Sequence, residues 1–223
     1  MTFSLAGRCL ETGRLGYVVA TSSVCVGARV GAISRDCVVF SQARTDPRLH
    51  QIGIKGFDAS GGNPDAALRA MRDAAVAPHW RQLGVLPRNG DPAHHTGSSC
   101  LDHCGAAVGK DALALGNFLG SATVLPAMID AFTAANGDLA ERLLAGIRAG
   151  EAAGSEREPL QSASLVVMGA DELCDVDLRI DRSEDPIMEM GELLADWLPK
   201  APAYRIRALD PDNAPSSAEV ESR

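Results

Sequence analysis

The sequence is short of positive charge and of long apolar runs. Its 21 Lys and Arg residues are scattered along the chain and are outnumbered by 29 Asp and Glu residues, which gives a net charge of −8. A nucleic-acid partner is not expected, because binding to phosphates requires a basic stripe. No apolar run approaches the roughly 20 residues that span a bilayer, so the sequence also predicts no association with a membrane.

An export signal and a disulfide pattern are lacking as well. The first residues, Met1 to Arg8, have neither the basic start nor the long apolar core of a secretory signal. Six cysteines in a chain of 223 residues without such a signal are expected to remain reduced thiols. We therefore expect a cytoplasmic protein.

The composition is that of a packed globular chain, with 46% hydrophobic and 22% charged residues. No repeat or internal linker divides it, so we expect one domain over residues 1–199. Residues 200–223 are rich in Pro, Asp and Ser and are expected to form a C-terminal tail with few apolar anchors. We expect an extended arm that lies on a second copy of the chain in a homodimer. The alternative is that the tail folds back on its own domain.

The pattern of apolar residues predicts pairs of strands and pairs of helices. This order favours an α+β fold in which antiparallel sheets are covered by helices, and it argues against a strictly alternating parallel sheet. Asn63 and Asp138 are predicted helix caps. The predicted strands cover 3–6, 17–21, 24–33, 37–42, 81–86, 92–98, 161–168 and 175–181, and the predicted helices cover 64–75, 122–135, 138–153 and 186–198.

Thr2 suggests an enzymatic function. Removal of Met1 would leave Thr2 with a free α-amino group, whose pKa of roughly 7.7–8.0 lets it accept a proton near neutral pH. One residue would then supply both the nucleophilic hydroxyl and its general base. The alternative is that Thr2 has no special role, since threonine is common after an initiator Met.

A cluster of metal-binding residue types lies between positions 94 and 104. A zinc site would draw on such residues, but no second cluster with ligand spacing follows, and Cys174 is isolated. We therefore expect no metal and no cofactor. The cluster consists of His94, His95, Cys100, His103 and Cys104.

Short motifs follow one another along the chain: Thr2-Phe3-Ser4, Gln42-Ala43 with Asp46-Pro47, His95-Thr96-Gly97 with Cys100, Gly116-Asn117, Gln161-Ser162-Ala163, and Val176 to Asp181 with Asp185-Pro186. This ordered set resembles the bacterial family DUF1028, a domain of unknown function that is placed in the Ntn-hydrolase superfamily. The resemblance implies a four-layer αββα sandwich with the N-terminal residue at the mouth of a cleft between the sheets. It supplies no reaction or substrate. Two positions depart from the family pattern: Thr21 to Ser23 includes no basic residue, and Leu115 replaces a polar one.

Several candidate residues accompany Thr2 in the predicted site. Gly116 and Asn117 fit an oxyanion hole, although they equally fit a turn that leads into the next helix. Arg29 is a candidate cation that would lower the pKa of the Thr2 amine and hold a substrate carboxylate. The other candidates for substrate binding are Ser4, Gln42, His95 and Thr96.

We expect an amidohydrolase that uses Thr2 to cleave a small polar amide or a related C–N bond. The alternative is a non-catalytic protein of the same fold that binds a small molecule in the cleft. Side chains alternate along a strand, so Thr2 and Ser4 are predicted to face the cleft while Phe3 and Leu5 face the helices. Thr2 is then expected to border one cleft with His95 or Asn117.

Overall fold

The larger of two sheets is built around the first strand of the chain. A computed structural model describes residues 2–222. Six antiparallel strands form this sheet in the order β10-β9-β2-β1-β8-β7, so β1 lies inside it between β2 and β8. The strands are β1 (Thr2–Cys9), β2 (Arg14–Thr21), β7 (Gly105–Gly109), β8 (Ala112–Asn117), β9 (Ser162–Met168) and β10 (Cys174–Ile180).

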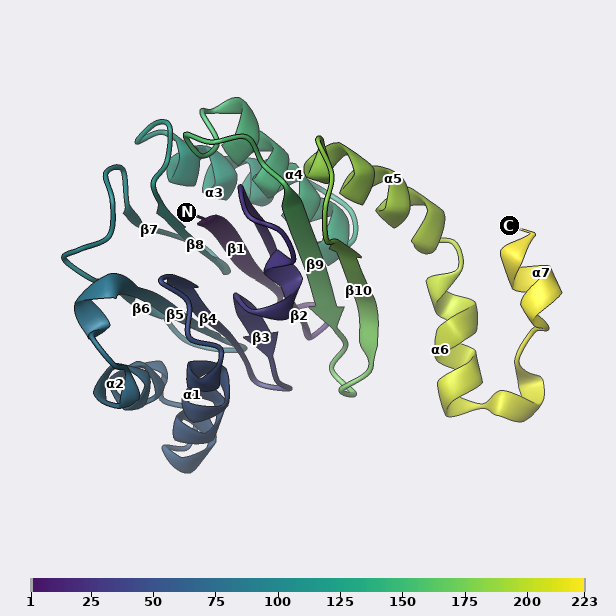
Figure 1. Ribbon diagram of the computed structural model, residues 1–223. Coiled ribbons are helices and arrows are strands. Elements are labelled where there is room, and N and C mark those ends of the chain that lie inside the picture. The colour runs from purple at the N-terminus through teal and green to yellow at the C-terminus, as the bar shows by residue number, and fades with distance from the viewer. Residues whose placement is uncertain (1, 223) are drawn as a thin grey trace.

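A second antiparallel sheet packs against the first (Figure 1). Its four strands follow the order β3-β4-β5-β6, with β3 (Gly31–Ile33), β4 (Cys37–Ala43), β5 (Arg81–Pro87) and β6 (Ala93–Thr96). Leu15 and Leu113 of the first sheet and Phe40 of the second are buried in the layer between them. The ring of Tyr17 meets that of Phe40 edge-on, with centroids 5.7 Å apart.

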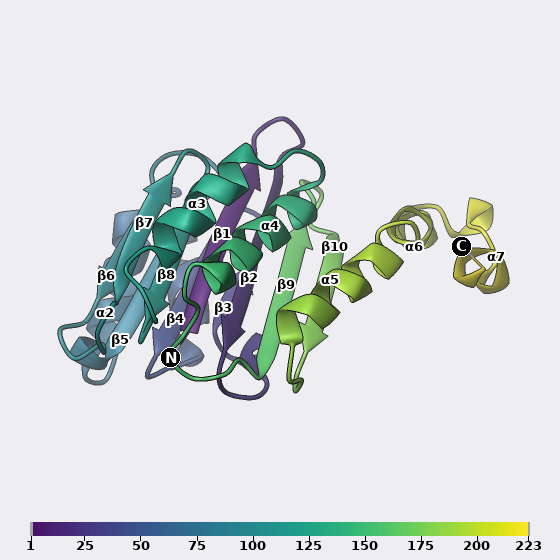
Figure 2. The ribbon, with the colours of Figure 1, turned by 90° about the horizontal axis from the view of Figure 1, so that it is seen from above.

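Helices cover the outer face of each sheet. The helices α3 (Val124–Ala134), α4 (Leu139–Ala152) and α5 (Pro186–Trp197) lie across the larger sheet (Figure 2). The helices α1 (Arg48–Ala59) and α2 (Pro64–Ala74) cover the smaller one. The predicted α+β fold, a four-layer αββα sandwich of antiparallel sheets, is confirmed. Among the helices of residues 2–222, none is long and apolar enough to cross a membrane.

The side chains of β1 point in turn to the helices and to the opposite sheet, as the sequence predicts. Phe3 and Leu5 are fully buried in the helix-covered core, where each large side chain contributes roughly 2–3 kcal/mol of burial free energy. Ser4 and Ala6 face the opposite sheet. Because side chains alternate with a period of two, Thr2 belongs to the same face as Ser4.

Helix α1 and strands β7 and β8 are missing from the sequence prediction, and the segment 24–33 differs from it. Helix α1 is not predicted because it contains Gly53 and Gly56, which weaken helix propensity. A Cβ at Gly53 would meet Met71 Sδ at 2.7 Å, so a side chain at this position would push against α2. Strands β7 and β8 are rich in Ala and Gly, which carry little strand signal. The segment predicted as one strand over 24–33 is a 3₁₀ turn (Val26–Ala28) followed by β3.

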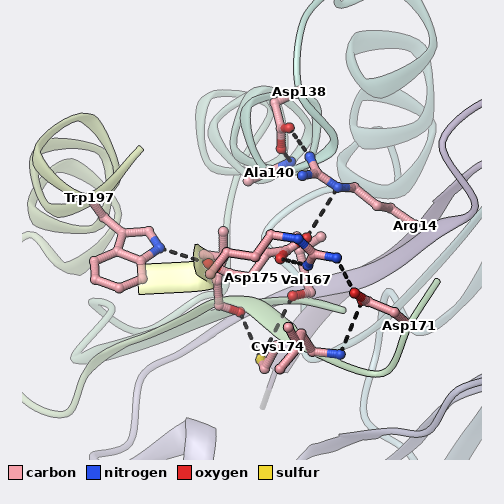
Figure 3. A network of polar contacts seen from close by, with 11 residues as sticks. Arg14, Asp138, Ala140, Val167, Asp171, Cys174, Asp175 and Trp197 are labelled. Atoms are coloured by element: carbon pink, nitrogen blue, oxygen red, sulfur yellow. Dashed lines mark hydrogen bonds and ion pairs between the residues drawn. The ribbon is translucent and has the colours of Figure 1, made fainter. Parts of the chain in front are cut away.

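The C-terminal tail is helical, whereas the sequence suggested an extended arm. It forms α6 (Ala201–Leu209), a 3₁₀ turn (Pro211–Asn213) and α7 (Ser217–Glu221), beyond β10 in Figure 1. Tyr204 stacks on Trp197 with ring centroids 5.2 Å apart. Arg205 forms an ion pair with Asp175 on β10 at 2.7 Å. Figure 3 shows the surrounding contacts, in which Arg14 also reaches Asp175 at 3.2 Å.

Candidate functional site

Thr2 begins an interior strand and is flanked by polar residues on both sides. It lies opposite Asn117 in the register of β1 and β8. On the other side, Phe3 pairs with Ala20, which places Thr21 beside Thr2 on β2. All three polar side chains are buried, with Thr2 only 4% exposed. Thr2 and Asn117 are therefore neighbours, but neither of them lines the cavity described below, so the cleft that they were expected to border stays a prediction.

A chain of buried polar side chains joins the two sheets next to Thr2. Ser4 Oγ donates to Gln42 Oε1 at 2.8 Å, and Gln42 Nε2 donates to Gln82 Oε1 at 2.8 Å. Asn117 Nδ2 donates to the same Gln82 oxygen at 2.9 Å. Strands β1, β4, β5 and β8 are thus linked by side-chain hydrogen bonds in a layer that is otherwise apolar.

Gln82 is the centre of this network. Its Nε2 lies 3.0 Å from Thr96 Oγ1, 3.0 Å from the carbonyl of Gly105 and 2.8 Å from the carbonyl of Gly116. Such a fully bonded amide fixes the orientation of its partners. Sequence reasoning missed Gln82, although a single polar residue at an inward position of an apolar strand is a usable signal.

Gly116 and Asn117 end strand β8 and do not form a turn. A Cβ at Gly116 would meet Leu119 Cδ1 at 2.8 Å, so a side chain there would push against the packed residues beyond the strand. The Asn117 amide has two hydrogens, and one of them is donated to Gln82. Asn117 is therefore held in place by a neighbour, and its amide has a second hydrogen that this bond does not use.

A cavity of about 1020 Å³ opens at the same end of the larger sheet. Its lining includes Ser22 and Phe118, which directly follow Thr21 and Asn117, the two residues that flank Thr2. Thr2 itself is not among the lining residues. Glu158, Arg182 and Glu184 give the wall a mixed charge.

Glu156 is a buried carboxylate at this end of β1. Its Oε2 accepts a hydrogen bond from the backbone N–H of Ser22 at 3.1 Å, and the residue is 6% exposed. Burial raises the carboxyl pKa above its ordinary value, against the opposing effect of the Ser22 hydrogen bond. The sequence gives no sign of this role, because Glu156-Arg157-Glu158 has the pattern of an exposed charged loop.

His95 and Thr96 do not share a site. Thr96 pairs with Gln82 and faces the layer between the sheets, whereas His95 pairs with Leu83, whose side chain packs against the helices. The His95 ring lies 3.4 Å from the carbonyl of Pro78, and burial lowers its pKa. The structure thus corrects the expectation that His95 faces the cleft, because neighbouring strand residues point to opposite faces.

The guanidinium of Arg29 is hydrogen-bonded to the loop that precedes it. Its guanidinium donates to the carbonyls of Val24 and Cys25 and to Ser23 Oγ at 2.9 Å. Ser23 Oγ lies 3.4 Å from Thr21 Oγ1, so Arg29 reaches the site only through two intervening residues. The expected direct contact with the Thr2 amine is not supported by this arrangement.

The cluster of His and Cys residues has no metal-binding geometry within residues 2–222, where no group of three or more His, Cys, Asp or Glu side chains is arranged to hold an ion. Cys100 Sγ instead lies 3.7 Å from the carbonyl of Arg81. All six cysteines of the chain are free thiols.

The fold and the site together define an αββα sandwich with a polar network beside the first residue of an interior strand. The chain matches the family model described as a family of unknown function, DUF1028, over residues 2–190, and it belongs to that family. A crystal structure of protein SPO2555 from Silicibacter pomeroyi, described as a DUF1028 protein, is similar at 31% identity and a TM-score of 0.80. That match covers 87% of this chain and 88% of the other. No curated protein matches the sequence.

Proposed function

We propose that the protein is an amidohydrolase of the Ntn-hydrolase superfamily, with Thr2 as its N-terminal nucleophile. The observation that carries the proposal is the position of Thr2. It begins an interior strand, lies opposite Asn117, and is 4% exposed. The cavity of about 1020 Å³ lies at the same end of the sheet. The αββα layers agree with the architecture that this superfamily uses to present an N-terminal nucleophile between its sheets.

In the proposed reaction, removal of Met1 frees the α-amino group of Thr2. This amine accepts the proton of the Thr2 hydroxyl as Oγ1 attacks the carbonyl carbon of an amide. Collapse of the tetrahedral intermediate breaks the C–N bond, and the ammonium returns its proton to the departing nitrogen. Water then hydrolyses the resulting ester and restores Thr2.

Asn117 is the proposed oxyanion donor. Its side-chain amide lies beside Thr2 in the register and is held by Gln82, so it needs no reorganisation during the reaction. Gly116 has a supporting role, because its carbonyl is bound to Gln82 Nε2 at 2.8 Å and the absent side chain leaves room for Leu119. Ser4, Gln42 and Thr96 act through the same network and do not touch the reacting atoms.

The cavity supports a small polar substrate. Arg182 would pair with a carboxylate of the substrate, and Glu158 and Glu184 would pair with a cationic or hydrogen-bond-donating group. The proposed substrate class is therefore a small amide, or a related C–N compound, that carries charged groups.

A ligand-binding protein without catalysis is the second candidate. The observation that favours it is that the polar side chains next to Thr2 bond to one another, Ser4 to Gln42 and Gln42 to Gln82, and that these side chains are neither acids nor bases. In this case the cavity binds the same class of molecule and Thr2 is a structural residue.

Intact-mass spectrometry of the natively expressed protein, followed by an assay for amine release from a panel of small charged amides, separates the two candidates. The hydrolase requires a mass that begins at Thr2 and a turnover that Thr2→Ala abolishes. A population that retains Met1 contradicts the proposed reaction, and thermal stabilisation by the same compounds without turnover supports the binding protein.

A further inference from the structure

Glu156 lies beyond the end of β1 at which Thr2 begins the strand. Beyond the end of β8, Leu119 forms an antiparallel bridge with Glu156. Beyond the end of β2, Ser22 donates its backbone N–H to Glu156 Oε2 at 3.1 Å. Since Thr2 lies opposite Asn117, two residues before Leu119, Glu156 fills the gap between the extensions of the two strands that flank β1.

The carboxylate of Glu156 is only half satisfied. Oε2 accepts the bond from Ser22, but Oε1 is buried and has no hydrogen-bond partner among residues 2–222. The adjacent Arg157 guanidinium lies over the ring of Phe118, 5.5 Å from its centroid. A buried carboxylate oxygen without a partner is costly, so this position calls for a donor that carries positive charge.

We propose that Glu156 is a positioning residue that binds the α-amino group of Thr2 once Thr2 is the first residue of the chain. This inference rests on the proposed function, because it gives a carboxylate partner to the amine that acts as general base. The freed amine lies at the end of β1 that Glu156 faces, and Oε1 is the acceptor available to it.

The proposed contact has two effects on the reaction. It turns the amine so that its lone pair faces the hydroxyl of the same residue, and it stabilises the ammonium that forms when the hydroxyl proton arrives. A carboxylate beside a histidine base acts in the same way in a Ser-His-Asp triad. Glu156 neither gains nor loses a proton over the cycle, since the ammonium passes its proton to the leaving nitrogen.

The test measures the pKa of the Thr2 α-amino group directly. The protein is produced behind a cleavable leader whose removal leaves Thr2 first, and the ¹³Cβ shift of labelled Thr2 is followed with pH. In Glu156→Gln the α-amino pKa is expected to fall by about one unit or more, because the neighbouring negative charge is lost. Glu11→Gln is the matched control and is expected to leave the pKa unchanged, since Glu11 is exposed in the turn after β1, at the end of that strand opposite to Thr2.

A second measurement needs no substitution and so does not depend on the folding of a variant. In the unaltered sequence, the pKa of the Glu156 carboxyl is followed by its ¹³Cδ shift before and after the leader is cleaved. It is expected to be lower after cleavage, when the Thr2 ammonium is present. An α-amino pKa that is the same in Glu156→Gln, or a Glu156 pKa that cleavage does not change, overturns the proposal.

Neither measurement requires turnover, so a failure of the role proposed for Glu156 can be distinguished from a failure of the proposed hydrolase function. Coupling between Glu156 and the amine in a protein that hydrolyses no amide leaves the positioning role in place and rejects the hydrolase. Hydrolysis that depends on Thr2, without such coupling, retains the hydrolase and rejects the role of Glu156.

Discussion

The hydroxyl of Ser4 donates a 2.8 Å hydrogen bond to the side-chain oxygen of Gln42, and this contact joins the first strand of the chain to the opposite sheet. Both side chains are fully buried. The bond continues through Gln82 to Asn117. Through this connection, a substitution in the smaller sheet is expected to disturb the residue that faces Thr2 in the larger one.

Gln82→Leu should destabilise the protein by roughly 3 kcal/mol or more, because Gln42, Thr96 and Asn117 lose their hydrogen bonds to Gln82 at once. Urea unfolding followed by circular dichroism measures the loss. Gln51→Ala, an exposed glutamine on α1, should change the unfolding free energy by less than about 0.5 kcal/mol. Similar stabilities for the two variants would mean that the network does not hold the sheets together.

His50 should make the protein less stable as the pH falls below neutral. It is buried and its Nε2 lies 3.1 Å from the carbonyl of Val30, and burial lowers its pKa below the ordinary value. The unfolded chain therefore binds a proton before the folded one does. The contribution of His50 is present above the unfolded pKa of about 6.5 and is lost as the pH falls through the lower folded pKa.

The matched variant for this prediction is His50→Gln, which does not titrate. Unfolding free energies measured at pH 7 and pH 5 should show that the unaltered protein loses more stability than the variant does. An equal loss in both proteins would assign the effect to other groups, among which His95 also has a pKa lowered by burial.

Arg205→Ala should loosen the tail from the domain. Arg205 holds α6 on β10 through Asp175, whose side chain is 9% exposed. The expected cost is about 1 kcal/mol, because Arg205 itself is one-third exposed and Arg14 continues to pair with Asp175. Limited proteolysis should cut the variant faster near residue 200. Arg207→Ala, which removes contacts to Ser217 and Tyr204 within the tail, should be cut at the rate of the unaltered protein.

The full-length protein should be a homodimer that depends on its tail. Ile206 and Leu209 on α6 are 41% and 61% exposed, and a second copy of the chain would cover them. Light scattering of the full chain and of a version that ends at Lys200 tests this expectation. A monomeric full chain refutes the dimer, and a dimer that survives truncation removes the tail from its interface.

Much of the fold follows from local signals in the sequence. Asn63 accepts a hydrogen bond from Ala66 N, and Asp138 forms a capping box with Glu141, so both predicted caps are confirmed. The alternation of Phe3 and Leu5 with Ser4 correctly assigned the faces of β1. Helix α1 and strands β7 and β8 could not be predicted, because their Gly and Ala residues are stabilised by packing between elements and carry weak propensities of their own.

The site was predictable only in part, because strand pairing and the faces of the strands decide which residues meet. The proximity of Thr2 to Asn117 follows from the pairing of two strands, one of which had not been predicted. His95 and Thr96 form one sequence motif, yet the period of the strand sends them to opposite faces. Glu156 could not be found because the sequence does not reveal that a charged loop closes over the end of β1.

Covalent labelling of Thr2 tests the central claim most directly. The mature protein is treated with a small electrophilic β-lactone, and the N-terminal peptide is examined by tandem mass spectrometry. We expect an ester on Thr2 Oγ1 that is absent from Thr2→Ala, and labelling that persists in Thr2→Ser because the hydroxyl and the amine are retained. Two results would contradict the account: a protein that begins at Thr2 but is not modified there, or a Thr2→Ala variant whose N-terminal peptide is labelled to the same extent as that of the unaltered protein.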